Sequence, residues 1–500
     1  MALSAQGGTR TRTAKRPTPL KRVCIPIPPP GLRKNYKQFL EIFNYYLREG
    51  NKKCYNQFMN SDLKNNNWPL ARVVAVSMGY GHQRTAYPLR VFTLDKKFIN
   101  VNDYPDIPGK DRQIWESSRR FYEFISNFYN LPLIGKIGFS IFDYFQKIPQ
   151  FYPKRDLSKP DFVLRRLYIL IQKGWGKHLI EKLNNENKKI GKKLPLISTF
   201  FTPAFMAEVH RYQGEIFCVV CDSDVSRTWA PLMPSKSRIK YFAPTERVGE
   251  RLNLYGVKKE NIFFTGYPLP LENIGDEKMI LLKEDLKNRI YNLDPDKKNF
   301  SKYQHLIEAE LEEIPQKSNH LLTLMFAIGG AGAQKELAIE IVKSLKEKVL
   351  NKELKIFISV GVKPLVRQFI EKALWKLNLQ KNYHIALIGG ENLYDYFQNF
   401  NQALRKTDIL WTKPSELSFY TALGLPIIMA PTIGSQEDFN REWLLKLGSA
   451  VPQENVKYTN QWLFDYLKDG FFAEAAMQGF IEGNKMGVLN IKKIIEICSG

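Results

Sequence analysis

Residues 408–443 read DILWTKPSELSFYTALGLPIIMAPTIGSQEDFNREW, and this stretch predicts the class of fold. It opens with the end of an apolar strand, Ile409–Trp411, and passes through a Lys-Pro-Ser turn into a helix-length segment whose first turn carries Glu416. A Gly-Leu-Pro sequence stops that helix, and the next apolar run, Ile427–Ala430, has the composition of a buried parallel strand. The order strand, helix, strand indicates a doubly wound α/β sheet, in which ligands bind at the carboxyl ends of the strands.

Length, charge and cysteine content limit the organisation and the partners. The chain has 500 residues, more than one core holds, so we expect two domains with additional segments. Lys and Arg number 74 against 50 Asp and Glu, and the resulting net charge of +24 favours an anionic partner: a nucleic acid, an anionic membrane surface or a phosphorylated substrate. Five cysteines spread along the chain do not form a disulfide framework, which favours a reducing, cytosolic setting.

Two kinds of targeting segment are not expected. No run approaches the roughly 20 consecutive apolar residues of a membrane span, and the amino terminus lacks the apolar core of a signal peptide. Residues 1–34 are instead basic and proline-rich, which indicates a disordered arm; such an arm either touches nucleic acid or acidic lipid or is only a leader.

The first half of the chain carries a glycine-rich turn after its first clear strand, Ala71–Ser77. Gly79 and Gly81 let the backbone turn sharply and approach a ligand, and the following helix offers free N–H groups to an anion. His82 comes directly after them. A lone Gly-x-Gly is a weak signal, and the alternative is a helix cap with a solvent-facing imidazole.

A later strand, Ile216–Val220, runs into an acidic turn that begins at Asp222. Asp222-Ser223-Asp224 has the form of a DxD metal site, although a metal is not our expectation here. Cys218 and Cys221 have CxxC spacing, but residues three apart on a strand point to opposite faces and no second pair is near. We therefore expect Cys218 to be a core residue.

The second half repeats the unit of strand, glycine-rich loop and helix. Strand 321–328 delivers Gly329–Gln334 into a helix at Lys335–Val349, so backbone amides of Gly330, Ala331 and Gly332 can cradle a diphosphate. The loop lacks the lysine of a P-loop and the later acidic residue of a dinucleotide fold. A nucleotide-sugar loop fits better than NAD binding or ATP hydrolysis.

Taken together, these motifs resemble GT-B glycosyltransferases, in particular the lipid-acting group that contains monogalactosyldiacylglycerol synthase and the peptidoglycan N-acetylglucosaminyltransferase. The resemblance covers both halves in the same order. Its matching residues are Gly79, Gly81, His82, Asp222, Trp229, Thr265, Gly266, Pro268, Lys413, Pro414, Gly424, Leu425, Pro426, Pro431, Gln436, Glu437 and Asn440. It implies an α/β GT-B fold, with two Rossmann-like domains whose parallel sheets face a cleft, and a UDP-sugar bound by the carboxyl-terminal domain.

The resemblance also implies roles for residues of this cleft. His82 or Asp222 is the candidate base, and Gln436 and Glu437 hold sugar hydroxyls. The remaining donor and phosphate contacts are Gly79, Gly81, Arg227, Gly330, Ala331, Gly332, Lys413, Ser415, Glu416 and Asn440. The implied reaction transfers a sugar from a UDP-sugar to a lipid or carbohydrate acceptor at an anionic membrane surface, without a metal, a cofactor or a nucleic acid partner.

Two positions depart from the family pattern. The ribose-binding Glu of the family falls on Phe419 here, while Glu416, about one helical turn earlier, lies near the same face. Glu416 either replaces that carboxylate or only complements the helix N-terminus. Arg227 stands near a family His; it cannot act as a base but can bind phosphate. These departures leave two rivals open: a UDP-sugar epimerase-like enzyme and a non-catalytic nucleotide-sugar-binding protein.

We expect the following organisation. After the basic arm, an amino-terminal Rossmann-like acceptor domain spans 35–270, a polar helical linker 271–319, a nucleotide-sugar domain 320–458, and helices that cross back to the first domain 459–500. Within the first domain, residues 118–156 interleave Phe and Tyr with Lys and Arg. This composition suits a membrane interface or stacking on single-stranded nucleic acid, and part of it has the spacing of a helix core.

Overall fold

The computed structural model describes residues 68–128, 148–330, 332, 334–432 and 435–499, which all fall within one compact unit, Asn66–Gly500. The basic arm, Ala331 and residues 129–147 of the aromatic and basic stretch lie outside the described residues. Within the part of that stretch that is described, Phe151 is buried and Tyr152 is exposed.

The first sheet has six parallel strands in the order β2-β1-β3-β4-β5-β6. Val73 pairs with Ile197, and Ile197 pairs with Phe217, so apolar residues continue from strand to strand as in a sheet covered on both faces. The strands are β1 (Arg72–Ala75), β2 (Ile99–Asn100), β3 (Leu196–Ser198), β4 (Ile216–Val219), β5 (Lys240–Ala243) and β6 (Ile262–Phe264). The helices are α3 (Gly81–Leu89), α4 (Gly109–Phe128), α6 (Phe162–Gln172), α7 (Lys177–Lys189), α8 (Phe201–Val209) and α9 (Glu246–Leu254).

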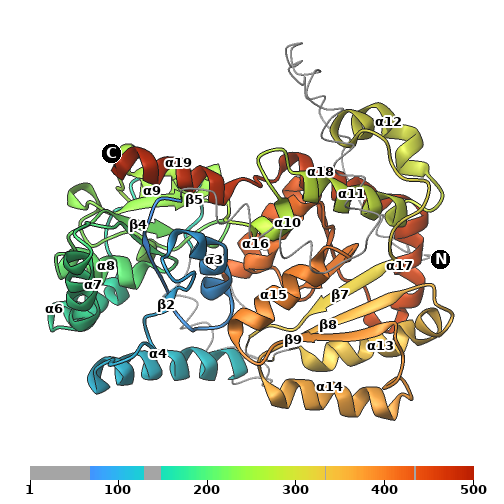
Figure 1. The fold of residues 1–500 in the computed structure, drawn as a ribbon, viewed down its shortest axis with the longest axis horizontal. Helices are drawn as coiled ribbons and strands as arrows, with labels where there is room; N and C mark the ends of the chain where they lie inside the picture. Colours follow the sequence, from blue (N-terminus) through green and yellow to red (C-terminus); the bar gives the residue numbers. More distant parts are fainter. Residues whose placement is uncertain (1–67, 129–147, 331, 333, 433–434, 500) are drawn as a thin grey trace, which may run out of the picture. The chain divides into compact units, whose positions relative to one another are not determined.

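The second sheet also has six parallel strands, in the order β12-β11-β10-β7-β8-β9. In Figure 1, α13 and α14 lie on one side of β7, β8 and β9, and α15 lies on the other. The strands are β7 (Thr323–Ala327), β8 (Lys355–Gly361), β9 (Ile385–Gly389), β10 (Ile409–Thr412), β11 (Ile427–Met429) and β12 (Ala450–Pro452). The helices are α13 (Lys335–Leu350), α14 (Pro364–Lys376), α15 (Leu393–Leu404), α16 (Ser435–Leu447) and α17 (Thr459–Lys468). Two sheets of parallel strands with helices confirm the expected α/β fold class with two Rossmann-like sheets.

One element differs in kind from its prediction. The segment after Lys413 is the 3-10 helix η5 (Glu416–Leu423), and it ends at Gly424, which adopts a left-handed conformation with φ of 65°. All side chains from Leu417 to Leu423 are buried. A segment that is buried on all sides has no solvent-exposed face and so lacks the amphipathic pattern of a surface α-helix. Its helix type is therefore set by packing against its neighbours.

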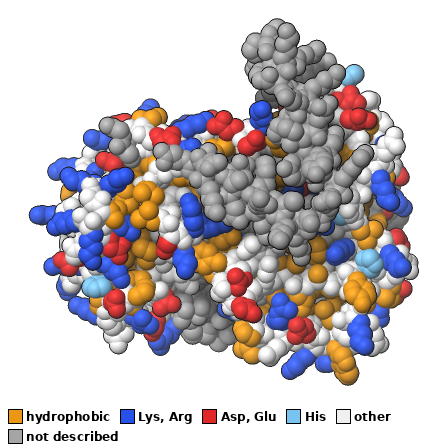
Figure 2. Space-filling view, in the orientation of Figure 1, with side chains coloured by type: hydrophobic (Ala, Val, Ile, Leu, Met, Phe, Trp, Pro, Cys, Tyr) orange, Lys and Arg blue, Asp and Glu red, His pale blue; other side chains and the backbone are white. Residues whose placement is uncertain are grey.

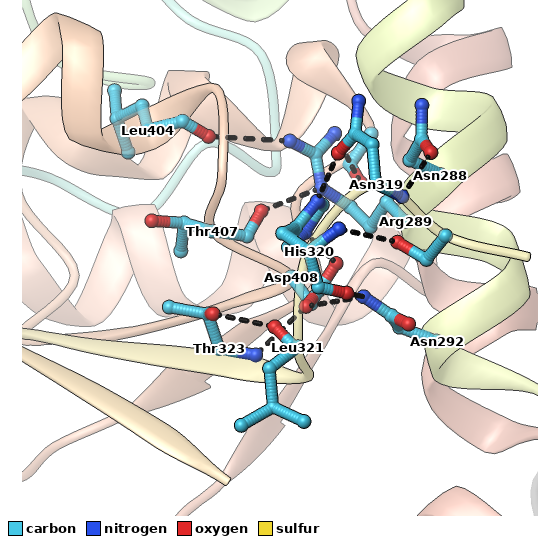
Figure 3. Close-up of polar contacts among 12 residues, drawn as sticks. Asn288, Arg289, Asn292, Asn319, His320, Leu321, Thr323, Leu404, Thr407 and Asp408 are labelled. Atoms are coloured by element: carbon cyan, nitrogen blue, oxygen red, sulfur yellow. Dashed lines mark hydrogen bonds and ion pairs between the residues drawn. The ribbon is translucent and has the colours of Figure 1, made fainter. Parts of the chain in front are cut away.

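Helices α10 (Leu271–Ile274), α11 (Ile280–Leu293) and α12 (Lys298–Leu311) connect the two sheets. A buried polar cluster joins α11 to the amino ends of β7 and β10 (Figure 3). Arg289 donates to the carbonyl oxygens of Leu404, Thr407, Leu423 and Gly424. Asp408 accepts hydrogen bonds from the backbone of Thr323 and from the side chains of Asn292 and His320. The cluster therefore stabilises the second sheet at the amino ends of its strands, opposite the carboxyl ends.

The chain closes with α18 (Phe471–Glu482) and α19 (Gly487–Ser499). Helix α19 contacts the first half: the Asn490 side chain donates to the carbonyl oxygen of Thr265 at 2.8 Å, and Lys240 Nζ lies 3.7 Å from Cys498 Sγ. Of the helices in the described part of the chain, none is both long and apolar enough to span a membrane.

Candidate functional site

A cavity of about 170 Å³ lies between the two halves, at the carboxyl ends of strands from both sheets. Most of the residues that the sequence singled out meet there, although the strands that carry them are far apart in the chain. The cavity is lined by Gly79, Gly81, His82, Asp222, Gly330, Lys413, Ser415, Glu416, Gln436 and Glu437, together with Tyr80, Arg84, Cys221, Tyr396 and others.

His82 stands at the amino end of α3, and two groups lie beside its Nδ1 atom. The Thr199 carbonyl oxygen is 2.8 Å from Nδ1 and Cys221 Sγ is 3.3 Å from it. Because a carbonyl oxygen can only accept, Nδ1 carries the proton and Nε2 keeps its lone pair. Burial lowers the pKa of His82 to about 4, against the opposing effects of the Thr199 carbonyl and Glu416, so the imidazole is neutral at neutral pH.

Thr199 holds His82 at a second point. Its hydroxyl donates to the His82 carbonyl oxygen at 2.9 Å. The rings of Phe200 and Trp229 lie with their centroids 4.6 and 6.4 Å from the imidazole. The ring is therefore fixed in orientation and enclosed by aromatic side chains on one side.

Asp222 follows β4 and faces the same cavity. Asn440 donates to its Oδ1 atom at 3.2 Å, and Cys221 Sγ lies 3.9 Å from its Oδ2 atom. Burial raises the pKa of Asp222 to about 6; the Asn440 hydrogen bond opposes that rise, and the negative charges of Glu416 and Glu437 add to it. The carboxyl group is thus a second titratable group at this site.

Asn440 was expected to contact the donor, but the structure gives it another position. The side chain is completely buried and does not line the cavity. Its Oδ1 accepts from the backbone N–H of Ser223 at 2.8 Å, while its amide donates to Asp222 and to the carbonyl oxygen of Pro414. Asn440 therefore joins the two halves and positions Asp222, because all of its hydrogen bonds go to the protein.

Arg84 is a site residue that sequence reasoning missed. It is buried, and its Nε donates to Glu416 Oε1 at 3.2 Å while its Nη2 donates to the Tyr396 hydroxyl at 3.0 Å. The guanidinium also lies 4.2 Å from the ring centroid of Phe400. One signal was available: Arg84 is three residues after Gly81, and so on the same face of α3 as the glycine turn.

Glu416 reaches the cavity, whereas Phe419 does not. Phe419 stacks on Tyr267 of the first half, with centroids 4.8 Å apart, and packs on Trp443. Glu416 pairs with Arg84 through Oε1, and a Cβ atom built on Gly81 would lie 3.2 Å from Oε2. The position of the family carboxylate is therefore an aromatic contact here, and the nearby acid faces Gly81 and Arg84.

The glycine turns of the two halves approach each other closely. A Cβ atom on Gly330 would lie 3.0 Å from the backbone nitrogen of Tyr80. The Tyr80 hydroxyl in turn accepts from the backbone N–H of Val362 at 3.0 Å. Lys413 pairs with Glu437 at the same cavity, while Gly332, with φ of 78°, does not line it.

Arg227 was expected in the cleft, but it does not line this cavity. Its guanidinium is buried and donates to the carbonyl oxygens of Ser158, Ala230 and Pro231, which occupy all three of its nitrogens. Four of its five N–H donors are thus used on backbone carbonyls, and Arg227 does not line the cavity. Arg227 is a structural residue that holds loop 226–231 to Ser158.

The second acid of the DxD form at residues 222–224 is engaged by two arginines. Asp224 is buried, and both of its oxygens accept from Arg251, with Arg247 bonded to Oδ2 as well. In the described part of the chain, no cluster of His, Cys, Asp and Glu has the arrangement of a metal site. Cys218 is buried in the core, whereas Cys221 lines the cavity beside His82.

The chain was compared with protein families, curated proteins and solved structures. The model of a domain of unknown function (DUF6938) matches residues 312–388, which is less than a sixth of the chain. No curated protein matches. The chain is similar in structure to MurG of Acinetobacter baumannii, with 12% identity over 86% of this chain and 100% of that one and a TM-score of 0.42.

Two further solved structures are similar to a comparable degree. A UDP-GlcNAc 2-epimerase from Neisseria meningitidis bound to UDP-GlcNAc has 15% identity, covers 65% of this chain and 81% of its own, and has a TM-score of 0.40. A glycosyltransferase from Rickettsia africae has 12% identity, covers 87% and 98%, and has a TM-score of 0.39.

Proposed function

We propose that this protein transfers a hexose from a UDP-sugar to an acceptor hydroxyl, with His82 as the general base. The observation that carries the proposal is the state of the imidazole. Its Nδ1 proton is directed at the Thr199 carbonyl, its pKa is low enough to keep it neutral, and it lines a cavity between the ends of two sheets. An oriented neutral imidazole accepts a proton at Nε2.

In the proposed reaction the acceptor oxygen forms a bond to the anomeric carbon while the bond from that carbon to the UDP oxygen breaks. The hydroxyl proton passes to His82 Nε2, and UDP leaves with the electron pair. The backbone amides at the amino end of α3 and near Gly330, with Lys413, would take up the charge on the diphosphate. Gln436 and Glu437, at the first turn of α16, would hold sugar hydroxyls, and Glu416 the ribose.

The proposed transfer is metal-independent. Both oxygens of Asp224 are committed to Arg251 and Arg247, so the DxD sequence does not present two carboxylates to one ion. The charge of the leaving group is then taken up by N–H dipoles and a lysine.

The acceptor class we propose is a lipid presented at an anionic membrane surface on the cytoplasmic side. The net charge of +24 supports this assignment because a basic protein is attracted to an acidic surface. Figure 2 shows Lys and Arg side chains along the left edge of the molecule, over helices of the first half.

Titration calorimetry with UDP and UDP-sugars tests the donor site. Glu416→Gln and Gln436→Ala should each weaken binding by about tenfold or more, or about 1.4 kcal/mol. Gln304→Ala, on the exposed face of α12, is the matched control and should bind as the wild type does. No binding of any uridine nucleotide would refute the proposal. Release of a free sugar epimer from the UDP-sugar without an acceptor would replace it with an epimerase function.

A further inference from the structure

Helix α6 has two apolar faces, of which only one is covered. Leu164, Tyr168 and Ile171 are buried, and Tyr168 packs on Phe205 of α8 with ring centroids 5.2 Å apart. Phe162, Ile169 and Leu170 point the other way and are 60%, 48% and 40% exposed. A surface helix normally carries polar side chains on its outer face, so large apolar side chains there call for a partner.

The charged side chains that α6 itself carries are all positive, and the only adjoining acid at its amino end is the capping residue Asp161. Phe162, Arg166, Ile169 and Lys173 are spaced by four, three and four residues, which places them on one stripe of the helix. The Arg166 guanidinium lies 5.6 Å from the ring centroid of Phe162. Residues 162–180 contain four Lys and Arg and no Asp or Glu. We call residues 162–173 with this exposed stripe the α6 face.

We infer that the α6 face is the surface by which the protein docks on an anionic membrane. Apolar side chains interleaved with Arg and Lys on an exposed helix are typical of a helix that lies in the plane of the lipid headgroups. Its cations attract acidic lipids, and a second copy of this chain would instead meet the same positive charges. The inference rests on the proposed function, since it identifies the surface that would bring a lipid acceptor to the site.

The buried face of α6, opposite the α6 face, is connected to the candidate base by a continuous run of aromatic contacts. Tyr168 packs on Phe205, and the ring centroids of Phe205 and Phe201 are 5.6 Å apart. The centroid distance is 4.2 Å from Phe201 to Phe200 and 4.6 Å from Phe200 to His82. Figure 1 places α6 beside α7 and α8 at one edge of the first half. Docking through α6 would thus place the membrane against the helix whose Tyr168 packs on α8, and α8 begins beside the Phe200 ring that contacts His82.

Vesicle flotation of the full-length protein tests the inference. We expect binding to vesicles of phosphatidylcholine with phosphatidylglycerol and much weaker binding to phosphatidylcholine alone, with binding to the acidic vesicles falling as salt is raised. Ile169→Ser/Leu170→Ser and Arg166→Gln/Lys173→Gln should each reduce the affinity for acidic vesicles by about tenfold. The altered side chains are exposed, so these variants should fold normally.

The control is Leu365→Ser, which removes a 79% exposed leucine from α14 and should bind vesicles as the wild type does. Unchanged vesicle binding by both α6 variants would overturn the inference, as would failure of the wild type to bind acidic vesicles. If the serine variant instead abolished self-association in sedimentation, the partner would be a second copy. Titration of every variant with UDP separates this result from the donor site: UDP binding should stay unchanged whether or not the vesicles bind.

Discussion

At the scale of single residues, the chemistry of this protein depends on how His82 is held. Thr199 bonds both the ring and the backbone of that residue, and Cys221 lies beside the same nitrogen. The nearby Asp222 is held by Asn440 across the cleft. His82 and Asp222 therefore each have a fixed neighbour that sets their orientation, and burial lowers the pKa of the first and raises the pKa of the second.

Replacing His82 tests its role as the base. His82→Gln should reduce kcat for sugar transfer by about 10²–10⁴-fold, because the acceptor hydroxyl loses its proton acceptor. Affinity for UDP should stay within about twofold of wild type, since the proton transfer takes no part in donor binding. Equal losses of UDP affinity and kcat would show that His82 is a donor contact instead.

The pH dependence distinguishes the two candidate bases. A base acts only above its own pKa, so with His82 in this role kcat/KM should persist as pH falls through 6 and decline toward 4, the pKa of the buried imidazole. An inflection near 6 that Asp222→Asn removes would assign the role to Asp222, whose pKa is raised to about 6. Circular dichroism at each pH shows whether the protein is still folded.

At the scale of elements, η5 is held by the close approach of α18. Gly479 of α18 lies against η5 so tightly that an added Cβ would be 2.4 Å from the Thr421 hydroxyl and 2.6 Å from its carbonyl oxygen. Gly483, one turn later, faces Ala422 in the same way. The glycines let the helix backbone approach η5, which carries Glu416 into the cavity.

Gly479→Ala should therefore destabilise the protein by about 1–3 kcal/mol, despite the helix propensity of alanine, because the new methyl group overlaps backbone that cannot move away. The midpoint of urea denaturation measures this loss. Gly109→Ala on α4 is the control: nothing lies within 4 Å of the added Cβ, so we expect no loss of stability. Equal midpoints for Gly479→Ala and the wild type would contradict the packing argument.

At the scale of the whole molecule, several polar contacts join the two halves at the cleft. They include the Arg84–Glu416 ion pair, the Asn440 hydrogen bonds to Asp222 and Ser223, and the Tyr80 hydroxyl on the backbone of Val362. The stack of Phe419 on Tyr267 adds an apolar contact between the same halves. The geometry of the cavity therefore depends on residues of both sheets.

The Arg84–Glu416 ion pair should contribute more to stability than the exposed Arg120–Glu116 pair. Arg84→Gln takes the buried partner away from Glu416, whose side chain is only 12% exposed, and should cost about 3–5 kcal/mol. Arg120→Gln breaks an exposed pair with Glu116 and should change stability by less than about 1 kcal/mol. Thermal unfolding of both variants and of the Arg84→Gln/Glu416→Gln double variant checks this: the double variant should recover part of the loss, and full additivity would exclude coupling.

The sequence by itself determined the class of fold and the loops that form the site. Buried parallel strands are apolar along their whole length and the turns between strand and helix need glycine, so both signals are local and could be recognised at Ile409–Trp411 and at Gly79–Gly81. The carboxyl ends of parallel strands share one edge, which explains why His82, Asp222 and Lys413 meet at one cavity.

Only the tertiary structure decided which partner each polar side chain meets. Arg84 and Glu416 are 332 positions apart, and Arg227 turns to backbone carbonyls that no spacing rule connects to it. Phe419 became a core residue because Tyr267 lies across from it. The outer face of α6 was likewise recognised only from its exposure, because a helix with two apolar faces has the same composition as a buried one. Local patterns encode burial and turns, whereas the pairing of charges depends on how distant segments are brought together.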